Sequence, residues 1–289
     1  MILKSQVRAA DGTPLAVTTW GNTPASIVLM HGFADASYLW KPFARSLMNH
    51  VGVLAMDLRG HGDSGWDQNG RYGVGAFVAD ANIILERRCS GDLVLVGHSL
   101  GAELAIRLAA MDPRRVRALV LVDGGPGVAD TGVSQARVHF KQRIQTFPGL
   151  PEYRRALREW LPLADPDMVE LSVKQALREC EGGYRLKCDP RLAEMAPPDA
   201  DGTLWSLLES LHCPSLLIRA EASAVLSRNA ATEIVRRIPR VRCETVAMAG
   251  HAVMMDNPKE FGAILQRFIG RFYPQTALRN QPAFAGEHS

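Results

Sequence analysis

The sequence predicts an α/β fold: a mostly parallel central sheet, helices on both of its faces, and a helical cap inserted before the last two strands. Short β-prone runs alternate with helical patterns through residues 16–122. The alternation stops near residue 124 and returns near residue 215. Strands that alternate with helices form a sheet covered on both faces, so the interruption indicates an insertion.

The first part of the core, residues 1–123, supplies the predicted strands and helices before the insertion. The run Leu93-Val94-Leu95-Val96 is wholly apolar, as expected for a strand with both faces covered. Pro113 marks the end of a strongly helical segment, because proline cannot continue a helix. The predicted strands are 16–20, 26–30, 51–56, 93–96 and 117–122, and the predicted helices are 38–49, 77–88 and 102–111.

The insertion, residues 124–211, contains helical patterns broken by proline and glycine but no convincing strand. The core resumes in residues 212–273, where the predicted strands are 215–219 and 241–246 and the predicted helices are 227–238 and 258–273. Residues 274–289 are polar and contain proline, which predicts a flexible tail. Ligands bind at the carboxyl edge of open α/β sheets, where the insertion begins, so we expect it to act as a lid.

Composition and charge exclude some classes of protein but say little about the partner. The 289 residues are 47% hydrophobic and 22% charged, which is enough apolar material for a full core. A net charge of +3, from 33 basic and 30 acidic residues, argues against a nucleic-acid partner. No stretch approaches the roughly 20 apolar residues of a membrane span, and no secretory signal is expected. Five scattered cysteines predict reduced thiols and a cytoplasmic location. No oligomeric state is predicted.

The motif Gly97-His98-Ser99-Leu100-Gly101 lies between a predicted strand and a predicted helix. In this context, G-x-S-x-G places the serine on a strained turn from which its hydroxyl projects. The flanking glycines let strand and helix approach without a Cβ clash. The Leu100 N–H then lies at a helix N-terminus, where it can stabilise an oxyanion. We therefore predict that Ser99 is a nucleophile.

A serine hydroxyl needs a general base, and His251 is the predicted one. It follows the last predicted strand, at the same sheet edge as Ser99. Of the eight histidines, it alone follows the nucleophile at a late strand end, as the chain order serine, acid, histidine requires. His98 lies inside the motif and is instead a candidate substrate-binding residue.

Four segments occur here in the order typical of the α/β-hydrolase superfamily: His31-Gly32-Phe33, residues 57–64, residues 97–101 and Gly250-His251. Over about residues 1–273 the sequence resembles the capped esterases, thioesterases and carbon–carbon-bond hydrolases of this superfamily. The resemblance implies the α/β-hydrolase fold and a helical cap at residues 124–211. It also implies that the Phe33 N–H joins that of Leu100 in an oxyanion hole, and that no metal or other cofactor is needed.

His31 is expected to be structural, and in the same family the residues that match Asp57 and Arg59 hydrogen-bond the loops into place. The resemblance therefore implies a structural role for these three, although their position at strand ends would also suit acid–base chemistry.

The acid of the expected triad departs from the family pattern. Relatives carry an aspartate just after the strand that follows the cap, where this sequence has Ala224. An acid must hold the histidine in the right tautomer and stabilise the imidazolium. Asp123, at the end of the strand before the cap, is the preferred candidate, and Glu221 is the second. Two further possibilities are that Ala224 is an engineered replacement and that catalysis is weak.

The favoured interpretation is a serine hydrolase that cleaves an ester, thioester or lactone through an acyl-enzyme on Ser99. Trp160 and Trp205, both in the predicted cap, are expected to bind the apolar acyl part of this small-molecule substrate. One alternative is a carbon–carbon-bond hydrolase that uses the same serine and histidine. The other is a catalytically weak ligand-binding protein on the same fold, which Ala224 motivates.

Overall fold

The computed structural model describes residues 1–48, 51–238 and 240–273. Its eight-stranded sheet has the order β1-β2-β4-β3-β5-β6-β9-β10. The pairs β1–β2 and β2–β4 are antiparallel, and the remaining pairs are parallel, which confirms the predicted fold class. The strands are β1 (Ile2–Arg8), β2 (Pro14–Trp20), β3 (Ala25–Met30), β4 (Val53–Met56), β5 (Cys89–His98), β6 (Val116–Val122), β9 (Ser215–Ala220) and β10 (Val241–Val246).

The edge strand β1 is absent from the sequence prediction. Of its seven residues only Val7 is buried, so the run shows no clear alternation of apolar and polar side chains. It forms because it pairs along its length with β2, from Ile2 opposite Trp20 to Arg8 opposite Pro14. Pairing with a neighbour, rather than the local pattern, decides this strand.

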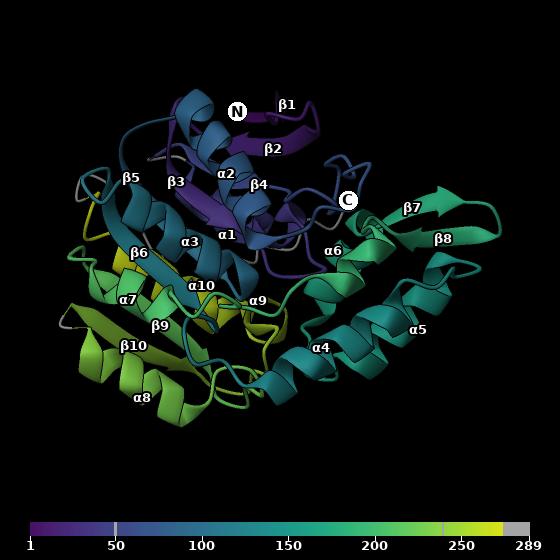
Figure 1. Ribbon diagram of the computed structural model, residues 1–289. Helices are drawn as coiled ribbons and strands as arrows, with labels where there is room; N and C mark the ends of the chain where they lie inside the picture. The colour runs from purple at the N-terminus through teal and green to yellow at the C-terminus, as the bar shows by residue number, and fades with distance from the viewer. Residues whose placement is uncertain (49–50, 239, 274–289) are drawn as a thin grey trace.

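Helices cover both faces of the sheet (Figure 1). On one face α2, α3, α7 and α8 follow one another, and on the other α1 packs against α10, where the Phe43 and Phe261 rings lie 4.8 Å apart. The predicted helix 38–49 is divided, because Pro42 suits only the first turn of a helix and α1 begins beside it. Outside the insertion, the helices are η1 (Ser37–Trp40), α1 (Lys41–Leu47), α2 (Val74–Arg88), α3 (Leu100–Met111), α8 (Arg228–Arg237), α9 (Val253–Asp256) and α10 (Pro258–Ile269).

Between β6 and β9 the chain leaves the sheet, and most of this stretch projects to one side of it (Figure 1). The last helix, α7, instead packs on α3 of the core. The division of the chain at residues 124 and 211 stays a prediction. The elements here are α4 (Asp130–Arg143), α5 (Leu150–Trp160), α6 (Pro166–Gln175), β7 (Leu177–Cys180), β8 (Gly183–Leu186), η2 (Pro190–Glu194) and α7 (Leu204–Glu209).

The prediction that this stretch contains no strand is wrong, because β7 and β8 form an antiparallel hairpin. Both strands are short and rich in charged residues, so they lack the apolar alternation that marks a strand. Gly182 and Gly183, with φ of +82° and +135°, make the turn that other residues would resist. The Arg178 guanidinium also lies 4.2 Å from the centre of the Trp66 ring, in a core loop. Tertiary contact therefore stabilises the hairpin.

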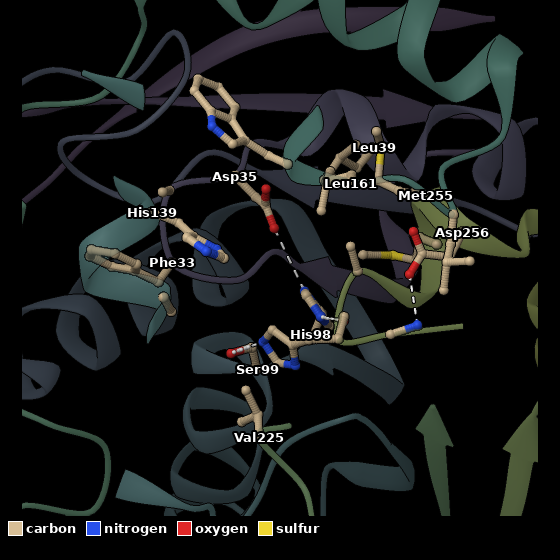
Figure 2. Close-up of a pocket in the computed structure, with 18 of the residues that line it drawn as sticks. Phe33, Asp35, Leu39, His98, Ser99, His139, Leu161, Val225, Met255 and Asp256 are labelled. Carbon is tan, nitrogen blue, oxygen red and sulfur yellow. Dashed lines mark hydrogen bonds and ion pairs between the residues drawn. The ribbon is translucent and has the colours of Figure 1, made fainter. Parts of the chain in front are cut away.

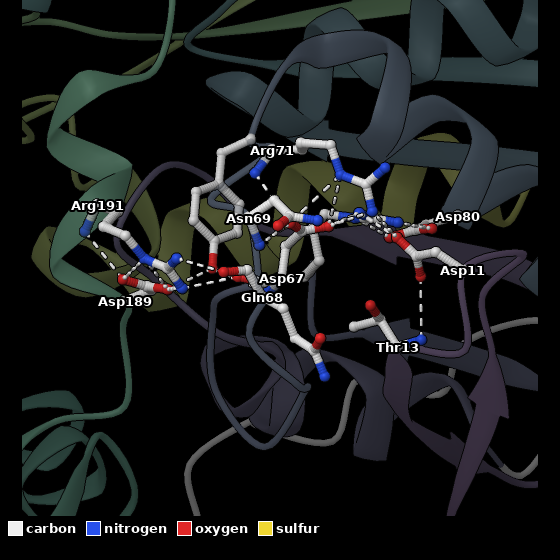
Figure 3. A network of polar contacts seen from close by, with 11 residues as sticks. Asp11, Thr13, Asp67, Gln68, Asn69, Arg71, Asp80, Asp189 and Arg191 are labelled. Carbon is white, nitrogen blue, oxygen red and sulfur yellow. Dashed lines mark hydrogen bonds and ion pairs between the residues drawn. The ribbon is translucent and has the colours of Figure 1, made fainter.

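A group of charged side chains fixes the loops beyond β4 (Figure 3); we call Asp11, Arg59, Asp67, Arg71 and Asp80 the Arg59 network. Arg59 donates from Nε and Nη2 to Asp80, at 2.6 and 2.7 Å. Its Nη1 donates to Asp11 at 2.9 Å and to Asp67 at 3.0 Å. These bonds agree with the structural role that the resemblance implies for Arg59.

Asp57 has a comparable role, because its carboxylate accepts from the backbone N–H groups of Ser37 and Asp63, at 2.6 and 2.8 Å. The Arg59 network is also joined to the insertion through η2. The Tyr72 hydroxyl donates to Asp189 at 2.5 Å, and Arg191 donates to the backbone carbonyl of Asp67 at 2.7 Å. These bonds connect the core loop after β4 to the second half of the insertion.

No helix within the described residues has the length and apolar character needed to cross a bilayer. All five cysteines belong to the described part of the chain and are free. The predicted tail, residues 274–289, lies outside the described residues.

Candidate active site

Ser99 lies at the turn between β5 and α3, as the motif predicts. Its φ of +52° is strained for a residue with a side chain, and this geometry projects the hydroxyl away from the sheet. The two end positions of the motif must be glycine, because there is no room for a side chain at either. A Cβ on Gly97 would lie 2.0 Å from the Gly101 carbonyl oxygen, and one on Gly101 would lie 2.3 Å from that of Met30. Strand and helix can meet here only without side chains.

A continuous chain of hydrogen bonds joins Ser99, His251 and Asp123. The Ser99 Oγ lies 3.0 Å from His251 Nε2, and His251 Nδ1 lies 2.8 Å from Asp123 Oδ2. Since an ionised carboxylate can only accept, Nδ1 carries the proton and Nε2 is free to accept the serine proton. Sequence order separates these residues by up to 152 positions, and the parallel sheet brings them to one edge.

Asp123 is fully buried and held by two other groups besides His251. Its Oδ1 accepts from the Ala220 N–H at 2.9 Å, and its Oδ2 accepts from the Ser223 hydroxyl at 2.5 Å. Glu221, the second candidate, accepts instead from the Met248 N–H at 3.0 Å. Ser223 lies next to Ala224, so the loop that lacks the family's aspartate contributes a hydroxyl that binds Asp123.

The two predicted oxyanion donors lie beside the serine. Leu100 is the first residue of α3, so its N–H has no partner within the helix. Phe33 follows β3, and neither N–H donates to any backbone carbonyl in the described parts of the chain. Gly32 is needed here, since a Cβ at this position would lie 2.8 Å from His98 Nδ1.

Two further histidines near the site are neutral for reasons of burial. Burial lowers the pKa of His31 to about 4, and its Nδ1–H donates to the Gly32 carbonyl while Nε2 accepts from the Leu58 N–H. These bonds support the structural role expected for His31. Burial, reinforced by His251, also lowers the pKa of His98. Its Nε2 donates to the His251 carbonyl at 2.9 Å, which leaves Nδ1 as an acceptor 3.7 Å from Asp35.

A cavity of about 310 Å³ opens at Ser99, and Figure 2 shows Phe33 and His139 on one side of it and Leu161 and Met255 on the other. Two of the three predicted substrate-binding residues, His98 and Trp160, line it. The third does not: Trp205 is not among the described residues that line it. Its ring lies instead under the Arg237 guanidinium, 4.3 Å away, because α7 packs on the core.

A second, smaller cavity of about 50 Å³ also reaches the serine. It shares Phe33, Ser99 and His251 with the first, so the reacting hydroxyl lies where the two meet. Its remaining lining is mostly apolar and comes from the loop after β6, from α4 and from the segment after η2: Val128, Val133, Met195, Ala196 and Pro198.

Most of the polar residues around the larger cavity could not be predicted from the sequence. Gln135, His139 and Arg143 lie on the face of α4 that lines it. Their spacing of four residues was a signal for one helix face, but nothing in the sequence indicated that this face meets Ser99. Ser223 was missed because its hydroxyl acts on Asp123 only through the fold.

Asp256 is a further, half-buried acid of the cavity and lies at the end of α9. Its Oδ2 accepts from the Gly250 N–H at 2.8 Å, the residue before His251. Its Oδ1 is buried and accepts no hydrogen bond from the described residues. Burial raises the pKa of this carboxyl to about 6, although the Gly250 bond and His251 oppose the shift.

A profile of the alpha/beta hydrolase family matches residues 27–264, and this span includes the turn at Ser99 as well as His251. The chain therefore belongs to the α/β-hydrolase family. Among the described residues, no group of three or more His, Cys, Asp or Glu side chains is arranged to hold a metal ion.

The alignments with several similar proteins extend over nearly the whole chain. A putative 2-succinyl-6-hydroxy-2,4-cyclohexadiene-1-carboxylate synthase of Bacillus subtilis is 29% identical, over 91% of this chain and 97% of the relative. An esterase of Mycobacterium tuberculosis is 26% identical, over 88% and 86%. The crystal structure of E-2-(acetamidomethylene)succinate hydrolase superposes with a TM-score of 0.83 at 23% identity, over 93% and 99%, and shows the same fold.

Proposed function

We propose that the protein is a serine hydrolase that cleaves an ester, thioester or lactone through an acyl-enzyme on Ser99. The observation that carries the proposal is the continuous chain of hydrogen bonds from Ser99 through His251 to the buried Asp123. Membership of a hydrolase family and an esterase among the relatives support it.

The proposed reaction has two halves. Ser99 Oγ attacks the carbonyl carbon as its proton moves to His251 Nε2, and the N–H groups of Phe33 and Leu100 stabilise the oxyanion. His251 then gives this proton to the leaving oxygen or sulfur, and the acyl group stays on Ser99. Water attacks the acyl carbon, loses a proton to His251, and the returned proton restores the serine hydroxyl as the acid leaves.

Asp123 is the proposed acid, and its surroundings suit that role. It accepts the Nδ1–H of His251, which fixes the tautomer and stabilises the imidazolium during each half reaction. The donors at Ala220 and Ser223 hold the carboxylate in place. With Asp123 as the proposed acid, just after the strand before the cap, the alanine at position 224 no longer argues for the non-catalytic alternative.

The larger cavity is suited to an apolar acyl chain. Its lining includes the apolar side chains of Leu39, Leu157, Trp160, Leu161 and Met255, from η1, α5 and the segment around α9. Pockets of this kind use many apolar contacts for affinity and a few polar groups for orientation. Trp160 is therefore proposed to contact the acyl chain.

The test combines a fluorophosphonate probe with p-nitrophenyl esters of graded length. We expect the probe to label the wild-type protein and not Ser99→Ala, which should lose about 10⁶-fold in kcat, as removal of a serine nucleophile does elsewhere. Asp123→Asn should lose about 10⁴-fold, because the histidine would then adopt the wrong tautomer. Glu221→Gln is the matched control and should keep activity within a few-fold.

Two results would contradict the proposal. Wild-type turnover by a folded Ser99→Ala variant would exclude the serine mechanism. Full activity in Asp123→Asn together with loss in Glu221→Gln would assign the acid to Glu221 instead.

A further inference from the structure

Arg143, the last residue of α4, lines the larger cavity. Its Nε atom is buried and has no hydrogen-bond partner within the described parts of the chain. Likewise, no carboxylate of the described residues lies within 4 Å of the guanidinium nitrogens. A buried cation without an acid partner is costly, so such a group in a cavity indicates a missing anion.

The groups around Arg143 keep its guanidinium protonated, but none of them is a carboxylate bound to it. Burial alone would lower the pKa of this guanidinium, but the charge interactions with Tyr153, Asp35 and Tyr38 keep it above its ordinary value. The Tyr153 hydroxyl is itself buried, and no described residue accepts or donates a hydrogen bond to it. The Tyr38 hydroxyl donates to Ser172 at 3.3 Å. Burial raises the pKa of Tyr153, and the Arg143 guanidinium beside it opposes the shift, so the two side chains are neighbours.

Stabilisation of the α4 helix dipole does not explain why an arginine stands at position 143. A cation in the last turn of a helix is favoured by the helix dipole. Lys141 already meets that requirement from the exposed side of the same turn. Arg143 instead lines the cavity, and its Nε atom is shielded from solvent.

The face of α4 that carries Arg143 offers hydrogen-bond donors along its length. Gln135, His139 and Arg143 line the cavity at intervals of four residues, about one helical turn each. A carboxylate matches the fork of a guanidinium with two parallel bonds. A phosphate dianion fits less well, because the C-terminal end of a helix carries partial negative charge.

We propose that the substrate carries a carboxylate that binds Arg143 while its ester or thioester bond lies at Ser99. This inference rests on the proposed serine hydrolase function and adds the substrate class. Ala136 lines both cavities where they meet at Ser99, and Arg143 lies seven residues further, roughly 10 Å along the helix axis. A monoester of a medium-length dicarboxylic acid spans that distance, and its methylene chain would contact Leu157 and Trp160.

The kinetic test compares mono-p-nitrophenyl esters of adipic, suberic and sebacic acid with the neutral hexanoate, octanoate and decanoate esters. We expect the wild type to prefer the charged ester at one of these lengths. Arg143→Met should lower kcat/KM for that ester by about 10- to 100-fold, the worth of a charge-assisted hydrogen bond, and leave the neutral esters within a few-fold. Arg143→Lys should retain part of the preference. Lys141→Met, the matched control, should retain all of it.

A second measurement is independent of turnover. Calorimetric titration of Ser99→Ala with suberate should show binding that the double variant with Arg143→Met loses and the double variant with Lys141→Met keeps. Equal rates for charged and neutral esters, with no suberate binding, would overturn the carboxylate site even if the probe labels Ser99. Suberate binding that depends on Arg143, in a protein whose Ser99 is never labelled, would support the site and refute the hydrolase proposal.

Discussion

Arg59 and Arg143 are both arginines with buried guanidinium atoms, but their surroundings differ. Arg59 donates to three carboxylates from all three of its nitrogens, in the loops shown in Figure 3. Arg143 lines the cavity at Ser99, and its Nε atom has no partner among the described residues. The first arginine is paired with three acids, whereas the second has no acid partner among the described residues.

The same contrast extends to neighbouring groups. Asp67 and Asp80, in the Arg59 network, have their carboxylates bound by Arg59. Around the cavity, by contrast, His98 Nδ1 and Asp256 Oδ1 are buried atoms without a partner in the described chain. Buried polar atoms are nearly always paired in folded proteins, so a group of unpaired ones around one cavity indicates where a ligand supplies the missing bonds. Arg178 and Arg185, which lie against Trp66, also have an unpaired Nε, so it is the grouping of unpaired atoms at one cavity that points to a ligand.

The largest effect on stability is expected in the Arg59 network. Arg59→Met would leave the buried carboxylates of Asp67 and Asp80 without their cation, which should lower the free energy of unfolding by about 3–5 kcal/mol. The measurement is urea-induced unfolding. Arg71→Met is the matched control, because Arg71 binds two of the same acids but its side chain is 59% exposed. It should cost less than about 1 kcal/mol, and equal losses in the two variants would contradict the argument.

A smaller effect, dependent on pH, is expected at Asp256. Its carboxyl has a pKa of about 6 in the folded protein against an ordinary 3.8, so the folded state keeps a proton that the unfolded state releases. Wild-type stability therefore falls as pH rises from about 4 to about 6 and remains lower above that range. Asp256→Asn cannot ionise, and its amide oxygen can still accept from the Gly250 N–H.

The stability of Asp256→Asn relative to wild type should accordingly rise by about 1–2 kcal/mol between pH 4.5 and pH 7.5, after allowance for the part of the side chain that solvent reaches. Urea unfolding at the two pH values measures the difference. Asp112→Asn, an exposed acid at the end of α3, is the control and should show no such trend. A pH-independent difference for Asp256→Asn would show that its pKa is not raised.

The parts of the molecule that the sequence predicted well are those fixed by local backbone constraints. The turn at Ser99 permits only glycine at positions 97 and 101, and such a requirement is visible in the sequence. The position of His251 followed from chain order and from its place after the last strand. Asp123 could be preferred as the triad acid, because only acids near the carboxyl edge of the sheet can reach a histidine at that edge.

The parts that could not be predicted depend on how the insertion packs against the core. Trp205 was assigned to the substrate because it lies in the inserted stretch, but α7 places it under Arg237 instead. The β7–β8 hairpin has no apolar alternation and depends on contacts with Trp66. Arg143 is one of 33 basic residues in the sequence, and only the fold distinguishes it from the exposed Lys141 two positions earlier.

The smallest expected effect is on the stability of the Arg143→Met variant, and it completes the contrast with Arg59. If Arg143 has no acid partner in the folded protein, its removal relieves the cost of burying a cation and leaves no carboxylate uncompensated. Methionine keeps most of the apolar stem that packs in the cavity. The free energy of unfolding should therefore stay the same or rise by up to about 1 kcal/mol, since replacing a buried charge by an apolar residue is often neutral or stabilising. Urea unfolding without ligand tests this. A loss comparable to that of Arg59→Met would mean that Arg143 is a structural residue, and the carboxylate site would lose its main support.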